Sequence, residues 1–293
     1  MTELSLGKNN NPGFLRNTGA VLAGSAAATA VVIPQQIGAA KCIEKMIKTG
    51  AGLTCDEVKI IHDAGDSLLK STGLAEKGVE KIIGIPDSMR KEFHKALSKM
   101  SGFWRNIIEK VHPFVQIEHG INACFVRPLS SPKYKEISNK IILPPGDNLV
   151  LSQFHEIGHA MNYNLSKAGK FLQKMRLPAL IAVPVIALIA LAKHKKAEGE
   201  KPEGFFDKAT TFIKNHAGKL TFAAFMPIVA EEALASFKGE KLAKTLLSPE
   251  LMQKVKLTNK FGLLTYAGLA VASAIGIALG VKVKDAIAQP KKA

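Results

Sequence analysis

Two histidines four residues apart bracket a glutamate in the run from His155 through Glu156 to His159. On a helix, residues at this spacing lie on one face, so both imidazoles can reach a single zinc ion. Glu156 would lie beside the metal without ligating it and could act as general base on a zinc-activated water. The alternative is a helix that carries two histidines and no metal.

The surroundings of this run favour a buried helix. Asp147 follows a Pro-Pro-Gly turn and is a candidate N-cap, so we expect a helix from near Asn148 to about Leu165. Gly158 lies between the histidines, where glycine weakens a helix by about 1 kcal/mol relative to alanine. Its presence there predicts that another part of the molecule approaches closely.

A catalytic zinc site needs a third protein ligand and leaves its fourth position open. No acidic residue occurs between Ala160 and Ala197, which excludes a ligand shortly after the histidines. The next acids lie in a Lys-rich polar stretch that predicts a loop: Glu198, Glu200, Glu203 and Asp207. After them, Glu231 and Glu232 lie on an apolar helical run, 228–236. A carboxylate in apolar surroundings is costly unless it is paired or bound to metal. The alternative is a helix that emerges into water with two solvated glutamates.

These two motifs resemble those of the gluzincin metallopeptidases, particularly the membrane-integral CAAX-prenyl-protease and heat-shock-protease group. That group carries HExxH on one helix and a later Glu-x-x-Ala-Asp on another, with membrane helices between them. Residues 232–236 (Glu-Ala-Leu-Ala-Ser) match the second motif, and the resemblance covers about residues 117–240.

The resemblance implies a zinc ion held by His155, His159 and Glu232, with Glu156 as the catalytic base. Glu231 would be a neighbour of the ligands. Ser236 departs from the family pattern, which has an acid there that orients a zinc-binding histidine, so the surroundings of the ligands are less well defined.

Two short β-rich runs, 121–126 and 140–143, precede the expected zinc helix. Gluzincins place a small sheet at this point, and its edge strand pairs with the backbone of the substrate. Such strand addition would bind a protein or peptide substrate with little sequence preference. His119 and Tyr134 are candidate transition-state donors, although generic surface roles are the alternative.

Two apolar segments separate the candidate ligands. Residues 177–192 carry no charge, and residues 220–230 are apolar again, with the Lys-rich stretch 193–219 between them. We expect the chain to cross a membrane by the first segment, turn in this basic loop, and return by the second. The 73 residues between His159 and Glu232 would then be a detour through the membrane.

Two further segments could span a bilayer. Residues 261–281 are uncharged and long enough to cross a hydrocarbon core of about 30 Å. Small residues recur every four positions there, as in closely packed membrane helices: Gly268, Ala272, Gly276 and Gly280. Residues 17–40 are weakly hydrophobic and could be a span, a signal-anchor or a signal peptide cut after Ala39 or Ala40; we favour a retained helix.

The region 41–116 is predicted to be helical and separate from the site. Thr54 and Glu57 form a capping-box pattern at the start of a helix that runs to about Ser71, and Asp87 could cap a second helix running to about Val111. The three cysteines have no CxxC spacing, which predicts neither a disulfide framework nor a cysteine zinc site.

The net charge of +16 is spread along the chain, and only three Tyr and one Trp could stack on bases. We therefore expect no nucleic-acid partner and instead attraction to anionic lipid headgroups. Basic residues balance on the two sides of the expected spans, so they do not set the orientation. The family resemblance alone favours a cytoplasmic active site.

The sequence therefore predicts a mainly α protein with a small β-sheet (α+β), a zincin-like core and three to four transmembrane helices. The expected domains are an N-terminal apolar helix (1–40), a helical region (41–116), a metallopeptidase core (117–260) with a membrane hairpin (177–237), and a C-terminal span with a basic tail (261–293). The expected function is that of a zinc-dependent, membrane-embedded endopeptidase. The alternatives are a non-catalytic membrane scaffold or pseudoprotease, and a soluble helical zinc peptidase, which the ordinary apolar share of 47% does not exclude.

Overall fold

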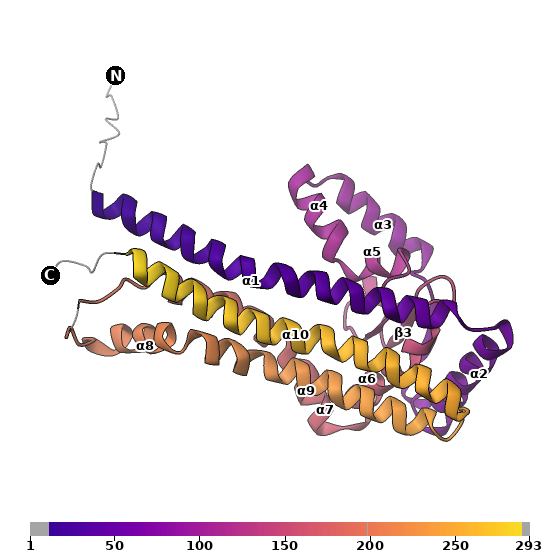
Figure 1. Cartoon of the computed structure of the whole chain (residues 1–293). Coiled ribbons are helices and arrows are strands. Elements are labelled where there is room, and N and C mark those ends of the chain that lie inside the picture. The colour runs from indigo at the N-terminus through magenta and orange to yellow at the C-terminus, as the bar shows by residue number, and fades with distance from the viewer. Residues whose placement is uncertain (1–11, 198, 289–293) are drawn as a thin grey trace. The chain divides into compact units, whose positions relative to one another are not determined.

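The computed structural model describes residues 12–197 and 199–288, and most of them are helical (Figure 1). The outermost parts of the predicted segments 1–40 and 261–293, residues 1–11 and 289–293, lie outside the described residues. The α-helices are α1 (Pro12–Ala51), α2 (Cys55–Ser71), α3 (Asp87–Ser98), α4 (Gly102–Val111), α5 (Pro113–Glu118), α6 (Gln153–Leu165), α7 (Lys167–Ala192), α8 (Gly204–Asn215), α9 (Ala217–Ala243) and α10 (Pro249–Ile287). Short 3-10 turns are η1 (Ala75–Lys77), η2 (Pro132–Tyr134) and η3 (Val150–Ser152).

The sheet has three strands in the described residues, in the order β1-β3-β2. β2 (Cys124–Val126) and β3 (Lys140–Leu143) lie in the two predicted runs and pair antiparallel, with Phe125 opposite Ile141. β1 (Glu80–Ile83) pairs parallel to β3, with Ile82 opposite Ile142. The prediction of an all-helical region 41–116 was therefore wrong at β1. A strand of four residues whose partner lies 60 positions away leaves no local pattern to detect.

The main core surrounds α6. Phe154 and Ile157 of α6 are fully buried together with Ile141 and Leu143 of β3. α2 and the first turns of α10 contribute the remaining apolar side chains, among them Leu68 and Val255. The region 41–116 therefore supplies part of the core that holds α6.

The predicted start of the helix that carries the histidines was wrong by five residues, whereas its end at Leu165 is confirmed. α6 begins at Gln153, and the preceding Val150–Ser152 form the 3-10 turn η3. Asp147 does not cap α6; its backbone carbonyl accepts a hydrogen bond from the N–H of Val150. Val150 and Leu151 are buried in the core, and this tertiary packing sets the tighter turn.

The capping box of α2 is confirmed. The side chain of Thr54 accepts from the N–H of Glu57, and the Glu57 carboxylate accepts from the N–H of Thr54. The helix predicted from Asp87 to Val111 is instead two helices, α3 and α4. Arg105 donates to the backbone carbonyls of Leu97 and Ser98, which closes the end of α3.

The chain divides into two compact units. We call the described parts of Met1–Ile37, Leu177–Met226 and Gly268–Ala293 the apolar unit. Gly38–Arg176 and Pro227–Ala267 form the mixed unit, which contains the sheet and α6. The stretch 193–219, predicted to be a loop, contains the helix α8, so that prediction was wrong.

Among the described residues, four helices are long and apolar enough to cross a membrane: Arg16–Ala51, Lys167–Ala192, Ala217–Ala243 and Pro249–Ile287. They include all four apolar segments expected from the sequence. The helical course continues from Pro12 through Ala39 and Ala40 to Ala51.

Small residues bring α1 and α10 together inside the apolar unit (Figure 1). A Cβ atom placed on Gly280 would lie 2.5 Å from the carbonyl oxygen of Gly24, and one on Gly276 would lie 2.7 Å from that of Ala28. Such distances are impossible for a real side chain. The close packing predicted from the four-residue repeat is therefore confirmed at these two glycines.

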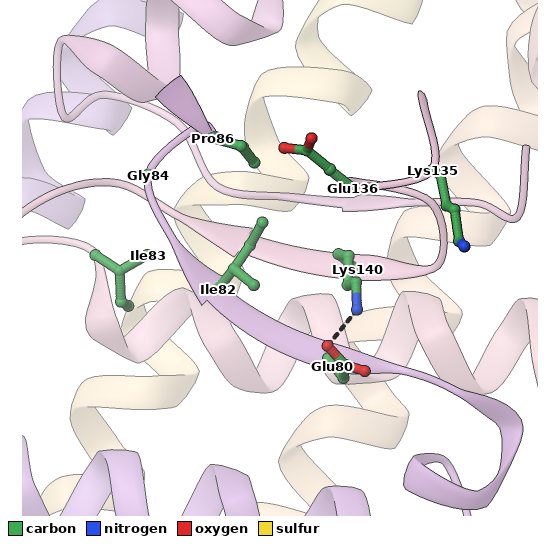
Figure 2. A pocket seen from close by; sticks show the side chains of 8 residues that line it. All are labelled: Glu80, Ile82, Ile83, Gly84, Pro86, Lys135, Glu136 and Lys140. Carbon is green, nitrogen blue, oxygen red and sulfur yellow. Dashed lines mark hydrogen bonds and ion pairs between the residues drawn. The ribbon is translucent and has the colours of Figure 1, made fainter. Parts of the chain in front are cut away.

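A shallow pocket of about 460 Å³ lies along β1, at the edge of the sheet away from β2 (Figure 2). Glu80 and Lys140 form an ion pair across it, and Ile82 lies beside them. None of the residues that line it is a candidate ligand or base, so the pocket does not bear on the histidine motif.

Substituting the glycines of α10 tests the contact between α1 and α10. We expect Gly280→Ala to lower the midpoint of thermal unfolding in detergent, because overpacking against backbone costs about 1–3 kcal/mol. Gly262→Ala is the matched control in the same helix, where nothing lies within 4 Å of the added Cβ. That variant should be neutral or stabilised by about 0.5–1 kcal/mol. Equal shifts for both variants would rule out the contact.

Candidate metal centre

The site begins with a close approach of the α6 and α9 backbones. A Cβ atom on Gly158 would lie 2.0 Å from the carbonyl oxygen of Ala235, and one on Gly239 would lie 2.1 Å from that of Phe154. Each helix thus presents a glycine to the other's backbone. The close approach predicted at Gly158 is confirmed, and α9 is the element that makes it.

This contact brings three potential ligand atoms together. The Nε2 atoms of His155 and His159 lie 2.9 Å apart. Oε2 of Glu232 lies 3.0 Å from the first nitrogen and 3.5 Å from the second. The imidazole rings are nearly perpendicular, at 87°. The two motifs, distant in sequence, therefore converge on one point.

The spacing of these three atoms fits a zinc ion. Ligand atoms arranged tetrahedrally at about 2.0–2.1 Å from zinc are separated by about 3.3 Å, close to the three observed distances. Two imidazoles and one carboxylate are a donor set of catalytic zinc sites, in which a fourth position stays open. His155, His159 and Glu232 therefore fit zinc in both chemistry and geometry.

The other nitrogen of each imidazole has its own partner. Nδ1 of His155 lies 3.0 Å from the hydroxyl oxygen of Ser236, and Nδ1 of His159 lies 2.7 Å from Oε1 of Glu231. In the tautomer that leaves Nε2 free to ligate, both Nδ1–H groups donate to these oxygens. Such hydrogen bonds fix the orientation of metal-binding histidines.

The two neighbouring glutamates have different surroundings. The carboxylate of Glu231 accepts hydrogen bonds from Asn162 Nδ2 at 3.0 Å and Gln173 Nε2 at 2.8 Å, besides that of His159. It is fully buried. Glu232 instead directs Oε2 at the two Nε2 atoms. The geometry thus favours Glu232 as a ligand and Glu231 as a group that orients His159.

Arg176 links the two glutamates. Its NH1 atom donates to Oε2 of Glu231 at 2.7 Å and to Oε1 of Glu232 at 2.6 Å. The guanidinium also lies 5.6 Å from the centre of the Tyr266 ring. The guanidinium therefore holds the far oxygen of Glu232, so that Oε2 points toward the histidines.

The electrostatics of the cluster favour a cation. Burial alone would lower the pKa of His159, but the carboxylates of Glu232 and Glu231 outweigh it and hold that pKa well above its ordinary range. Three carboxylates, those of Glu156, Glu231 and Glu232, lie around the imidazoles, and Arg176 pairs with the last two. A divalent cation in place of the proton on His159 would, together with the guanidinium, balance their three negative charges.

Glu156 lies close to the ligands without joining their network. Its carboxylate and one nitrogen from each histidine all lie within 4.8 Å of one another, and the residue is buried. Burial raises the pKa of the Cys124 thiol of β2, and the charge of Glu156 raises it further. The base candidate therefore lies near the candidate ligand atoms, on a helix that packs against strand β2.

The structure brings together all six residues proposed from the sequence: His155, Glu156, His159, Glu231, Glu232 and Ser236. Asn162, Gln173 and Arg176 were not predicted as site residues. The only sequence signal is the position of Arg176, which is the last polar residue before the uncharged part of α7. His119 ends α5 and Tyr134 lies in η2, and neither belongs to this cluster.

No family model, no curated protein and no solved structure matches this chain. The case for a function therefore depends on the geometry of the site and on the two motifs.

Zinc analysis of matched variants tests the assignment of the two glutamates. The purified protein should hold about one zinc per chain, and His155→Ala or His159→Ala should abolish stoichiometric binding. Glu232→Gln should lose zinc almost completely, because it removes a charged ligand. Glu231→Gln makes the same chemical change one residue away and should weaken binding only about 10–100-fold, through the orientation of His159.

Zinc is measured by mass spectrometry after dialysis against a series of chelators, and circular dichroism verifies the fold of each variant. A larger loss from Glu231→Gln than from Glu232→Gln would reverse the two roles. Full zinc in both histidine variants would exclude this site.

Proposed function

We propose that the protein is a membrane-embedded zinc endopeptidase that hydrolyses peptide bonds. The observation that carries this proposal is the convergence of the His155, His159 and Glu232 ligand atoms, with Glu156 beside them. The motif resemblance to the membrane-integral gluzincins supports the same reaction. Three protein ligands would leave the fourth metal position for water and substrate.

Zinc held by these three residues would polarise the scissile carbonyl. It would also lower the pKa of water, so that a nucleophile forms at neutral pH. Glu156 takes the proton from the attacking water and passes it to the nitrogen of the leaving amine. Glu231 and Ser236 hold the imidazoles of His159 and His155 in their ligating orientation, while Arg176 fixes the carboxylate of Glu232.

The substrate is proposed to be an extended peptide segment bound to β2. This strand is at the edge of the sheet, antiparallel to β3, and α6 packs against both strands. Because Glu156 lies on α6, which packs against β2, a strand added to β2 would pass near the base. Main-chain pairing would give affinity with little sequence preference.

The four apolar helices support a location in the membrane. α7 and α9 carry Arg176 and Glu232, respectively, and each also has a long uncharged stretch, 177–192 and 220–230. Attraction to anionic headgroups accounts for the basic composition. A cytoplasmic active site is proposed from the motif resemblance, since the basic residues balance.

The change Glu156→Gln keeps the size of the side chain but removes the base, so it separates an enzyme from a scaffold. We expect it to retain zinc, because no ligand is lost, and to abolish cleavage of a quenched-fluorescence peptide mixture by the protein in lipid nanodiscs. Loss of a general base costs about 10²–10⁴-fold in rate. Glu76→Gln, the same change at an exposed glutamate, should leave cleavage unchanged.

Undiminished cleavage by Glu156→Gln would remove Glu156 from the reaction. If that variant also supported the cellular role of the protein in full, the scaffold alternative would replace the peptidase.

The membrane hairpin is tested by cysteine labelling. After the three native cysteines are replaced by Ala, Lys167→Cys and Lys201→Cys each place one thiol at an exposed position on either side of the apolar part of α7. Because one crossing separates them, an impermeant maleimide should label the two from opposite faces of intact vesicles. Labelling of both from the same face would contradict the hairpin and favour the soluble alternative.

A further inference from the structure

The helix α8 has its polar and apolar faces reversed relative to an ordinary surface helix. It connects α7 to α9 within the apolar unit. At 100° per residue, Asp207 and Lys214 lie about 20° apart and roughly opposite Phe205. The polar pair points into the protein, and the phenylalanines point outward, as the contacts of each face establish.

Ion pairs hold the polar face of α8. Asp207 pairs with Lys193 and, at 2.9 Å, with Lys196. The ammonium group of Lys193, and to a smaller extent that of Lys196, holds the pKa of the Asp207 carboxyl far below its ordinary range. Lys214, only 8% exposed, pairs at 2.7 Å with Asp285 of α10. These contacts lie inside the apolar unit and fix which way the helix faces.

The apolar face is mostly uncovered by the described part of the chain, although the Phe212 ring stacks on His216. Phe205 is 79% exposed, Phe206 82% and Phe212 54%. The first two rings contact each other edge to face at 5.6 Å and lie outside the buried core. Leaving three such rings in water forgoes the favourable free energy of burying them. A soluble protein would turn this face inward and its charges outward.

We propose that α8 lies in the bilayer interface, with Phe205, Phe206 and Phe212 among the lipid acyl chains. The two helices that flank it are candidate spans, and the most apolar part of α7 is mostly uncovered as well. Exposed Lys201, Lys208 and Lys219 lie in or beside α8 and match the charge of anionic headgroups. The bilayer that would surround α7 and α9 would thus also lie against the apolar face of α8.

This inference rests on the membrane location in the proposed function and is independent of the metal. A second copy of the chain is the rival occupant of the apolar face. If the apolar face lies in the bilayer, a probe on it will contact bromine atoms on the acyl chains. If a second copy covers the face, the probe will contact protein.

The experiment places fluorescent probes at two exposed positions on opposite sides of α8. Trp104 is the single tryptophan, so Trp104→Phe gives a silent background in the full chain. Phe206→Trp reports the apolar face. Asn215→Trp is the matched control: it is exposed on the same helix, about 180° away. Both proteins are reconstituted in vesicles of phosphatidylcholine and phosphatidylglycerol with acyl chains brominated near the headgroup.

We expect Phe206→Trp to emit at shorter wavelength and to be quenched several times more strongly than Asn215→Trp. Equal quenching of the two probes, or none at position 206, overturns the inference. Cross-linking between chains through Phe206→Cys in place of quenching would assign the face to a second copy. Flotation of the vesicles and zinc content are measured on the same samples. Protein that floats and holds zinc without quenching at position 206 leaves the proposed function standing and refutes only the location of α8.

Discussion

The candidate site depends on how closely the α6 and α9 backbones can approach. Gly158 faces the carbonyl of Ala235, and Gly239 faces that of Phe154, so neither helix has room for a single additional carbon at the crossing. Helices that pack through larger side chains have axes about 8–10 Å apart. A wider crossing would move the Glu232 carboxylate away from the two imidazoles, because glutamate has limited reach. The conformational cost of two glycines within helices is therefore offset by the formation of a compact cluster of donors.

Around this crossing, two adjacent glutamates have separate tasks. Successive residues on a helix point about 100° apart, which lets Glu232 face the Nε2 atoms while Glu231 faces Nδ1 of His159. Arg176 contacts both carboxylates and limits their repulsion. The two histidines are oriented unequally, one by a carboxylate and the other by the neutral hydroxyl of Ser236. His159 should consequently be the more electron-rich donor of the pair.

Local patterns predicted much of this arrangement, and the failures share one cause. The histidine motif, the capping box at Thr54 and strand β3 are encoded within a few residues, and all were found from the sequence. The beginning of α6 was missed because burial of Val150 and Leu151, not a side-chain cap, determines where it starts. β1 was missed because it exists through pairing with β3. Gln173 and Arg176 were missed because their roles arise only where α7 meets Glu231 of α9.

The order of the ligands along the chain also governs when they can meet during synthesis. His155 and His159 emerge from the ribosome first, and all of α7 and α8 and half of α9 must follow before Glu232 exists. A nascent chain carries only two of the three ligand side chains until α9 has been made and has docked on α6. At the proposed site, metal capture would thus be coupled to the completion of folding. A peptidase built in this way would stay latent through its own biogenesis without needing a propeptide to restrain it.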